Sequence, residues 1–226
     1  MLSCRQLNRD YCGPNGTLPV LRDLSFEAAR GELLVIRGPS GAGKTTLLLT
    51  LGGMLRPDSG TVTVDGQDLY SLSAAARSRL RAHQIGFVFQ LFHLVPYLSV
   101  LENVLAGLPG SVDGAQRKRA SGLLKELGLA SRENHRPAAL SAGERQRTAL
   151  ARALIKEPRV MLADEPAGNL DPANGALVFQ HLEAYRRNGG TVVVVTHGTD
   201  SIPASARRLR LENGKLWEDS LAPRTS

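Results

Sequence analysis

GPSGAGKT, residues 38–45, is the most informative stretch of this sequence. It lies between two apolar runs, LLVI at residues 33–36 and LLL at residues 47–49, which predict a buried strand before it and a helix after it. In that context the pattern G-x-x-x-x-G-K-[ST] is typical of a loop that binds phosphate groups. The alternative, a glycine-rich turn with a chance lysine, is disfavoured because strand, loop and helix all agree.

The chemistry of the loop assigns roles to its side chains. Backbone N–H groups can curl toward phosphate oxygens, and the start of the following helix adds a positive dipole. We expect Lys44 to neutralise the β- and γ-phosphates, and Thr45 to offer its hydroxyl to Mg²⁺. The predicted nucleotide-binding residues here are Gly38, Ser40, Gly41, Gly43, Lys44, Thr45 and Thr46.

Tyr11 lies upstream of this loop and is one of few aromatic residues in the chain. An aromatic ring at this place could stack on a purine base. It could equally be half-buried at the edge of a sheet, and the sequence does not separate the two.

Polar residues follow three further apolar runs. Gln90 follows residues 85–89, Asp164 and Glu165 end residues 159–165, and His197 follows residues 191–196. Ligands of open α/β sheets collect at the carboxyl ends of strands.

We therefore expect Asp164 to hold Mg²⁺ and Glu165 to orient or deprotonate the attacking water. His197 is placed to donate a hydrogen bond to the γ-phosphate. Gln90 could reach Mg²⁺ or the water, although a polar residue that simply leaves a strand is the simpler reading of Gln90 alone.

A second anion-binding arrangement is predicted at LSAGE, residues 140–144, which precedes a helix. Ser141 and the small Gly143 leave free N–H groups at the helix start. Ser141 and Glu144 also form the pattern of a capping box, and both interpretations can hold together. Asp171 is the expected N-cap of a later helix that begins at Pro172.

Composition limits the class of protein. The 226 residues are 42% hydrophobic and carry a net charge of +7. No apolar run is long enough to span a membrane, and no secretory signal is expected after Met1. The positive residues occur in small groups without interleaved aromatics, so no nucleic-acid partner is expected. The two cysteines suit a reducing compartment.

The order of elements predicts a single α/β domain. Residues 2–9 could form an edge strand, followed by a turn-rich loop over residues 11–16. Residues 61–64 and the turn at Asp65-Gly66 indicate an antiparallel ribbon, and residues 74–82 read as a helix with Ser73 as its N-cap. Strands dominate a core of about 1–90 and 158–226, whereas about 91–157 are read as an inserted helical subdomain. The apolar segment 91–98 is expected either to serve a partner or to be a buried connector.

Taken in order, these motifs resemble the ATP-binding subunit of ABC transporters over nearly the whole chain. The segments 90–96, 101–104 and 164–171 resemble a branch that includes lipoprotein-release, macrolide-efflux and cell-division ATPases. The resemblance implies the P-loop NTPase fold of ABC ATPases, with ATP and Mg²⁺ as cofactors and Asp171 near the nucleotide.

The resemblance also implies a homodimer. Each ATP would lie between the phosphate loop of one copy and Ser141–Gly143 of the other. A separate transmembrane permease would be the partner, and export the direction, at the cytoplasmic face of the inner membrane. Ala142 departs from the usual glycine of the signature, and Gly198 from a frequent acidic residue.

The sequence leaves other functions open. One is a regulatory ABC ATPase that acts through a membrane partner on cell-envelope enzymes. Another is a soluble ABC ATPase of DNA repair, translation or iron–sulfur assembly.

Overall fold

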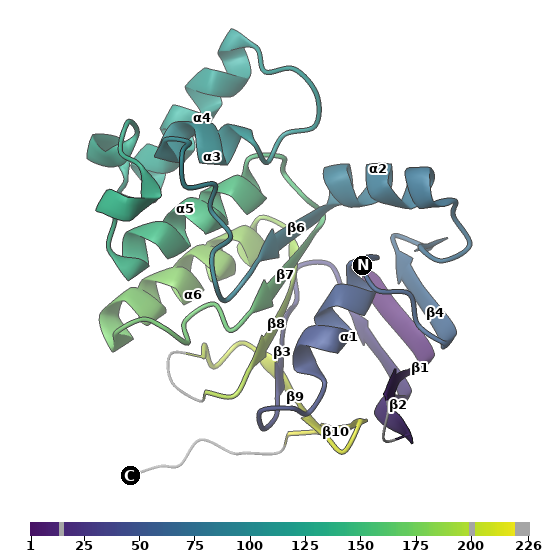
Figure 1. The fold of residues 1–226 in the computed structure, drawn as a ribbon. Coiled ribbons are helices and arrows are strands. Elements are labelled where there is room, and N and C mark those ends of the chain that lie inside the picture. Colours follow the sequence, from purple (N-terminus) through teal and green to yellow (C-terminus); the bar gives the residue numbers. More distant parts are fainter. Residues whose placement is uncertain (14–15, 199–201, 220–226) are drawn as a thin grey trace.

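The computed structural model describes residues 1–13, 16–198 and 202–219, which form two sheets with helices around them (Figure 1). The larger sheet has the order β10-β9-β3-β8-β7-β6. Its strands from β9 to β6 are parallel, and only β10 is antiparallel to its neighbour β9. The bounds are β3 Leu33–Arg37, β6 Ile85–Val88, β7 Val160–Asp164, β8 Thr191–Thr196, β9 Arg207–Glu212 and β10 Lys215–Glu218.

The smaller sheet is antiparallel, with the order β2-β1-β4-β5. This is the predicted ribbon, but two details of the prediction are wrong. The strand predicted over residues 2–9 is not at the edge, because β1 lies between β2 and β4. Residues 11–13 and 16 belong to strands, because cross-strand pairing extends through Cys12 and Thr17; residues 14–15 lie outside the described residues. The bounds are β1 Leu2–Gly13, β2 Gly16–Ala28, β4 Ser59–Val64 and β5 Gln67–Asp68.

The central strands are buried on both faces, as their continuous apolar runs predict. Successive side chains alternate between two cores because side chains of a strand point to opposite faces. Ile36 and Val195 pack with α1 and the smaller sheet, whereas Val35 and Val194 pack with the helices on the other face. The core around α1 therefore lies between the two sheets. Packing in this core fixes α1, the helix that follows the phosphate loop.

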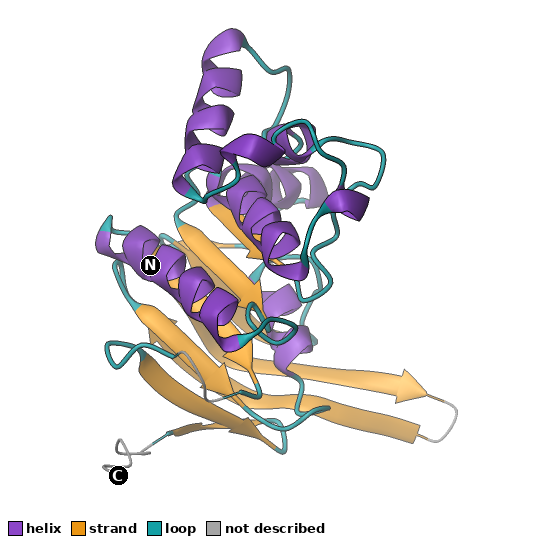
Figure 2. Cartoon of the chain, turned by 90° about the vertical axis from the view of Figure 1, so that its left-hand side faces the viewer, coloured by secondary structure: helices purple, strands orange, loops and turns teal. Residues whose placement is uncertain are grey.

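Six α-helices lie in the described part of the chain, coloured purple in Figure 2. Side chains cap several of them as predicted: Ser73 caps α2, Ser141 caps α5 with a complete capping box, and Asp171 caps α6. None of these helices is long and apolar enough to cross a membrane. Their bounds are α1 Lys44–Leu51, α2 Ala74–Gln84, α3 Val100–Leu105, α4 Gly114–Glu126, α5 Ala142–Leu154 and α6 Pro172–Arg187, with short 3-10 turns at Ala130–Arg132 and Pro137–Ala139.

Candidate functional site

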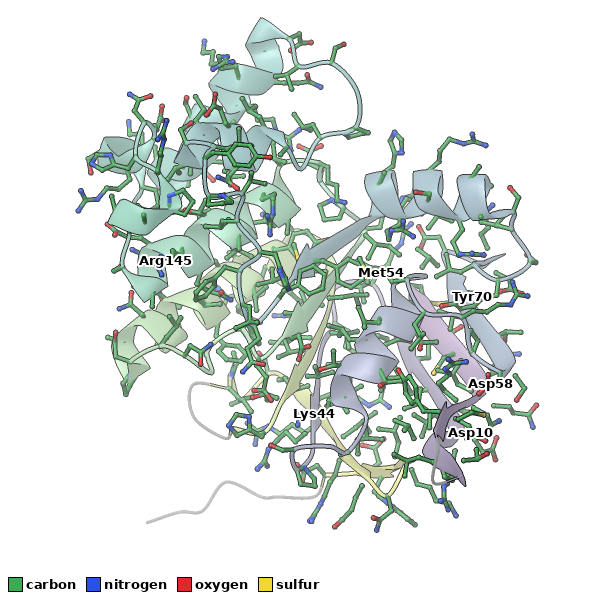
Figure 3. The ribbon with its side chains drawn as sticks, viewed as in Figure 1. Asp10, Lys44, Met54, Asp58, Tyr70 and Arg145 are labelled. Carbon is green, nitrogen blue, oxygen red and sulfur yellow. The ribbon has the colours of Figure 1, made fainter. Side chains whose placement is uncertain are left out.

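The phosphate loop connects β3 to α1 and includes Gly38, Ser40, Gly41 and Gly43. Gly43 is the N-cap of α1 with φ 94°, and an added Cβ would lie 2.7 Å from Val20 Cγ1. Both facts require glycine at this position. Lys44 is only 8% exposed, and its Nζ donates to the carbonyl oxygens of Gly38 at 2.8 Å and Pro39 at 3.0 Å. The ammonium group is therefore held across its own loop; Lys44 is labelled in Figure 3.

Thr45 and Asp164 meet, as the predicted magnesium site requires. Thr45 Oγ1 donates to Asp164 Oδ2 at 2.8 Å, joining the start of α1 to the end of β7. Burial raises the pKa of Asp164 above its ordinary value, although the bond from Thr45 opposes this. A hydroxyl and a carboxylate are oxygen ligands of the kind that Mg²⁺ prefers.

The raised pKa of Asp164 predicts opposite effects of Asp164→Asn on stability and activity. A carboxyl whose pKa is higher in the folded state loses its stabilising contribution as the pH rises through that pKa. We therefore expect the variant to melt at a higher temperature than the wild type at neutral pH, without nucleotide. The difference should shrink as the pH falls toward the ordinary value of 3.8.

The same variant should lose at least about 100-fold in Mg²⁺-dependent ATP hydrolysis, because metal stabilisation of the transition state amounts to several kcal/mol. Thermal melts over a pH series and steady-state ATPase assays measure the two effects. Asp10→Asn, at a half-buried residue of β1, is the control. Equal melting temperatures of wild type and Asp164→Asn across the pH series would contradict the raised pKa of Asp164.

Glu165 is the centre of a buried network. It is 7% exposed and has a positive φ of 44°, a strained backbone for a residue with a side chain. Its Oε1 accepts from the backbone N–H of His197 at 2.9 Å, and its Oε2 accepts from Thr196 Oγ1 at 2.8 Å. Lys44 Nζ lies 3.7 Å from Oε1. The carboxylate is thus fixed between the phosphate loop and the end of β8.

His197 also faces Glu165, with Nδ1 2.8 Å from Oε1. Because a carboxylate can only accept, Nδ1 carries the proton in this contact. Donation from Nε2 to a phosphate then requires the protonated ring, so the predicted role of His197 depends on its charge.

Gln90 is exposed two residues beyond the end of β6, and its backbone carbonyl oxygen accepts a long bond of 3.4 Å from Asn169 Nδ2. Tyr11 is 41% exposed, and its hydroxyl lies 3.4 Å from Thr46 Oγ1. The guanidinium carbon of Arg9 lies 5.2 Å from the centre of the Tyr11 ring. The exposed ring beside α1 favours the stacking interpretation, which stays a prediction.

The Ser141 arrangement lies apart from the phosphate loop. Figure 3 labels Arg145, one turn beyond Ser141 on α5, and Lys44, and the two are well separated. The start of α5 instead contacts α6. An added Cβ at Gly143 would lie 2.5 Å from Asn174 Oδ1, the atom that also accepts from Arg147.

Asn174 in turn joins this arrangement to Asp171. Asp171 accepts from the backbone N–H and the side-chain amide of Asn174, at 3.0 and 2.7 Å. The backbone bond is the main cause of a lowered pKa of Asp171.

A pocket of about 220 Å³ opens beside the carboxylate network, lined by Glu165, Asp171 and His197 among others. A larger pocket of about 660 Å³ lies between α4 and the end of α6, and no predicted site residue lines it. The smaller pocket is therefore the one that predicted site residues line.

Comparisons with known proteins agree with this geometry. The family model described as ABC transporter matches residues 21–168. The chain belongs to the ABC transporter family. A protein of Caulobacter vibrioides named "Lipoprotein-releasing system ATP-binding protein LolD 2" is 44% identical over 221 residues, which cover 96% of each chain.

Two solved structures of the cassette MJ0796 are also similar. The first, a dimeric ABC transporter cassette, has a TM-score of 0.88 and 35% identity, covering 96% of this chain and 98% of that chain. The second, a dimeric post-hydrolysis state bound to ADP and Pi, has a TM-score of 0.87 and 34% identity, with the same coverage. The predicted family, fold class and ATPase activity of the chain are confirmed.

Several residues of this ABC cassette escaped the sequence-based prediction. Thr196 donates to Glu165, but in the sequence it is only the last residue of a β-branched strand. Its position next to His197, at the end of that strand, is the sequence feature that could have indicated this role. Arg147 and Asn174 lie 27 positions apart, and no local pattern links them.

Ala142 in the ABC signature is exposed at the first position of α5. Ala142→Gly restores the usual signature residue and frees the backbone at the predicted phosphate contact to a second copy. We expect a higher ATPase rate, a few-fold at most, and a stability loss below about 1 kcal/mol, since glycine is a poorer helix former. ATPase assays and thermal melts measure both effects. An unchanged rate and dimer affinity would show that the methyl group of Ala142 does not weaken the phosphate contact.

Proposed function

We propose that this chain is the ATPase subunit of a system that releases lipoproteins or similar lipid-bearing substrates from a membrane. It would act at the cytoplasmic face of that membrane, together with a separate permease. The observation that carries the proposal is the 44% identity to the LolD 2 protein, which extends over 96% of both chains. The buried network around Glu165 supports the ATPase part of the proposal.

Mg²⁺ fits the residues that are present. Thr45 and Asp164 supply two oxygens already 2.8 Å apart, and the hydrogen bond between them leaves lone pairs for a cation. Bound Mg²⁺ would neutralise charge on the β- and γ-phosphates.

The residues of the chain divide the remaining work. When ATP binds, the ammonium group of Lys44 moves from the carbonyl oxygens of Gly38 and Pro39 to phosphate oxygens. Its hydrogen bonds to neutral acceptors are then replaced by stronger ones to charged acceptors. Glu165 is held by His197 and Thr196 where it can accept a proton from water attacking the γ-phosphate. Its contact with His197 couples that proton acceptance to the charge of the ring.

A head-to-tail homodimer completes the site. Arg145, one turn beyond Ser141 on α5, lies well apart from Lys44 in Figure 3, so the N–H groups at the start of α5 would reach a phosphate from a second copy. The dimeric cassettes of MJ0796 support this arrangement. ATP then bridges two subunits, and hydrolysis removes the bridge.

A groove of about 400 Å³ between α2 and α5 is the proposed permease contact. Its lining combines apolar side chains with Arg81, Arg152 and Lys156. Burial, together with Arg81, lowers the pKa of Lys156 to about 8. Nearby Leu91 and Tyr97 are 69% and 72% exposed. These features fit a permease segment that presents apolar residues and a carboxylate.

The test is reconstitution with its separate permease, in vesicles that carry a labelled lipoprotein and a soluble acceptor. We expect release of the lipoprotein with ATP, and none with the Glu165→Gln variant. ATP hydrolysis without release would contradict the lipoprotein assignment. Control of an envelope hydrolase under those conditions would indicate the regulatory function instead.

A further inference from the structure

Two side-chain amides are buried among the helices, and they differ in hydrogen bonding. Asn103 on α3 is fully buried, and its amide bonds to the backbone of Val95, Leu98 and Ser99. Gln146 on α5 is 1% exposed, and neither its Oε1 nor its Nε2 has a partner in the described part of the chain. Buried amides are almost always paired because desolvation is otherwise uncompensated.

Gln146 stands out among the unpaired buried polar atoms. The others are the Nε atoms of four arginines, and each of these guanidinium groups bonds through another nitrogen; they are Arg9, Arg37, Arg147 and Arg208. Within residues 1–13, 16–198 and 202–219, Gln146 alone has its entire polar group buried and unpaired.

The position of Gln146 on α5 indicates what its amide faces. Gln146, Ala149 and Ala153 share one stripe of the helix, at spacings of three and four residues. A methyl built on Gly86 of β6 would lie 3.1 Å from the carbonyl oxygen of Ala153, so this stripe faces β6.

The directions of α5 and β6 extend this argument. α5 leads through residues 155–159 into β7, whose first residue, Val160, pairs with Ile85 at the start of β6. α5 is therefore antiparallel to β6, as Figure 1 shows. Gln146 lies two helical turns before Ala153, about 10 Å along the axis of α5. About 10 Å is also the length of three extended residues beyond Gly86, so Gln146 is level with Phe89 and Gln90.

The segment after β6 is held by several bonds at residues 92–95, and Phe92 N–H also donates to the carbonyl oxygen of Phe89 at 3.0 Å. Arg152 donates to the carbonyl oxygens of Phe92 at 2.6 Å and His93 at 2.5 Å, and Asn103 binds Val95. At Gln90 the bond from Asn169, at 3.4 Å, is long. Gln90, which carries the predicted Mg²⁺ or water contact, is thus the weakly held residue of this segment.

We propose that Gln146 is a positioning residue for Gln90. In the ATP-bound dimer its amide hydrogen-bonds the backbone at Phe89 and Gln90 and so fixes the direction of the Gln90 side chain. The inference rests on the proposed ATPase function. The unpaired amide disfavours the arrangement described by the structure, and its pairing in the ATP-bound dimer is the differential contact that a two-state change requires.

The test compares wild type with Gln146→Met, which keeps the volume and removes the amide. We expect the nucleotide-free variant to melt about 2–4 °C higher, because an uncompensated polar group is gone. We expect kcat for ATP to fall about tenfold with little change in KM, because Gln90 is no longer held. Thr148→Val, a buried hydroxyl that bonds only within α5, is the matched control and should leave kcat unchanged.

A double-mutant cycle with Gln90→Ala shows whether Gln146 acts through Gln90. In the Gln90→Ala background, Gln146→Met should lower kcat no further. A higher melting temperature with unchanged kcat would overturn the proposal, and so would a lower melting temperature, which would mean that the amide is already paired. Absence of turnover in wild type would instead contradict the proposed ATPase function.

Discussion

Glu165→Gln should slow steady-state ATP hydrolysis by orders of magnitude and trap a dimer that forms only with ATP. The glutamine amide keeps the size of the side chain but cannot accept the proton of the attacking water. General-base catalysis contributes about 10²–10⁴-fold, so kcat should fall by that factor. Because the bridging γ-phosphate then persists, the dimer should survive size-exclusion chromatography in ATP and dissociate without it.

The surroundings of Glu165 make this substitution informative. Its carboxylate accepts from Thr196, from His197 and from the His197 backbone, so a glutamine must turn its NH₂ toward one of these donors. We therefore expect a modest loss of stability as well. Glu157→Gln, at an exposed residue that pairs with Arg119, is the control and should behave as wild type. Unchanged turnover in Glu165→Gln would remove Glu165 from the base role.

Lys44→Met should weaken binding of Mg²⁺-ATP by about 10- to 100-fold. A charge-assisted hydrogen bond contributes about 1.5–3 kcal/mol, and 1.4 kcal/mol is a factor of ten in affinity. Methionine keeps the length of the side chain, so the change removes the charge with little loss of packing. Isothermal titration with ATP measures the affinity, and AMP should be affected much less because Lys44 is assigned to the β- and γ-phosphates.

The same variant tests the ion pair between Lys44 and Glu165, whose atoms are 3.7 Å apart and both buried. Loss of the cation leaves the Glu165 carboxylate with neutral donors and His197 only, so the variant should be less stable than wild type. Lys156→Met, in the groove beside α5, is the control and should keep wild-type affinity for ATP. An affinity within threefold of wild type in Lys44→Met would contradict the phosphate role.

The prediction of the fold succeeded where short-range patterns carry the information. The loop 38–45 is predictable because strand, glycines, lysine and helix are contiguous. The N-caps Ser73, Ser141 and Asp171 are predictable because a cap binds N–H groups two or three residues away. The strand-end positions of Asp164 and His197 follow from buried apolar runs.

The sequence by itself therefore determined the order of elements, the phosphate loop and which residues stand at strand ends. Only the tertiary structure decided how those residues meet. Pairing of distant strands made β1 an inner strand, and packing gave Glu165 its positive φ and its bonds to Thr196 and His197. Packing also buried the amide of Gln146. The physical reason is that local propensity acts over a few neighbouring residues, whereas these contacts join positions tens of residues apart that only the packed chain brings together.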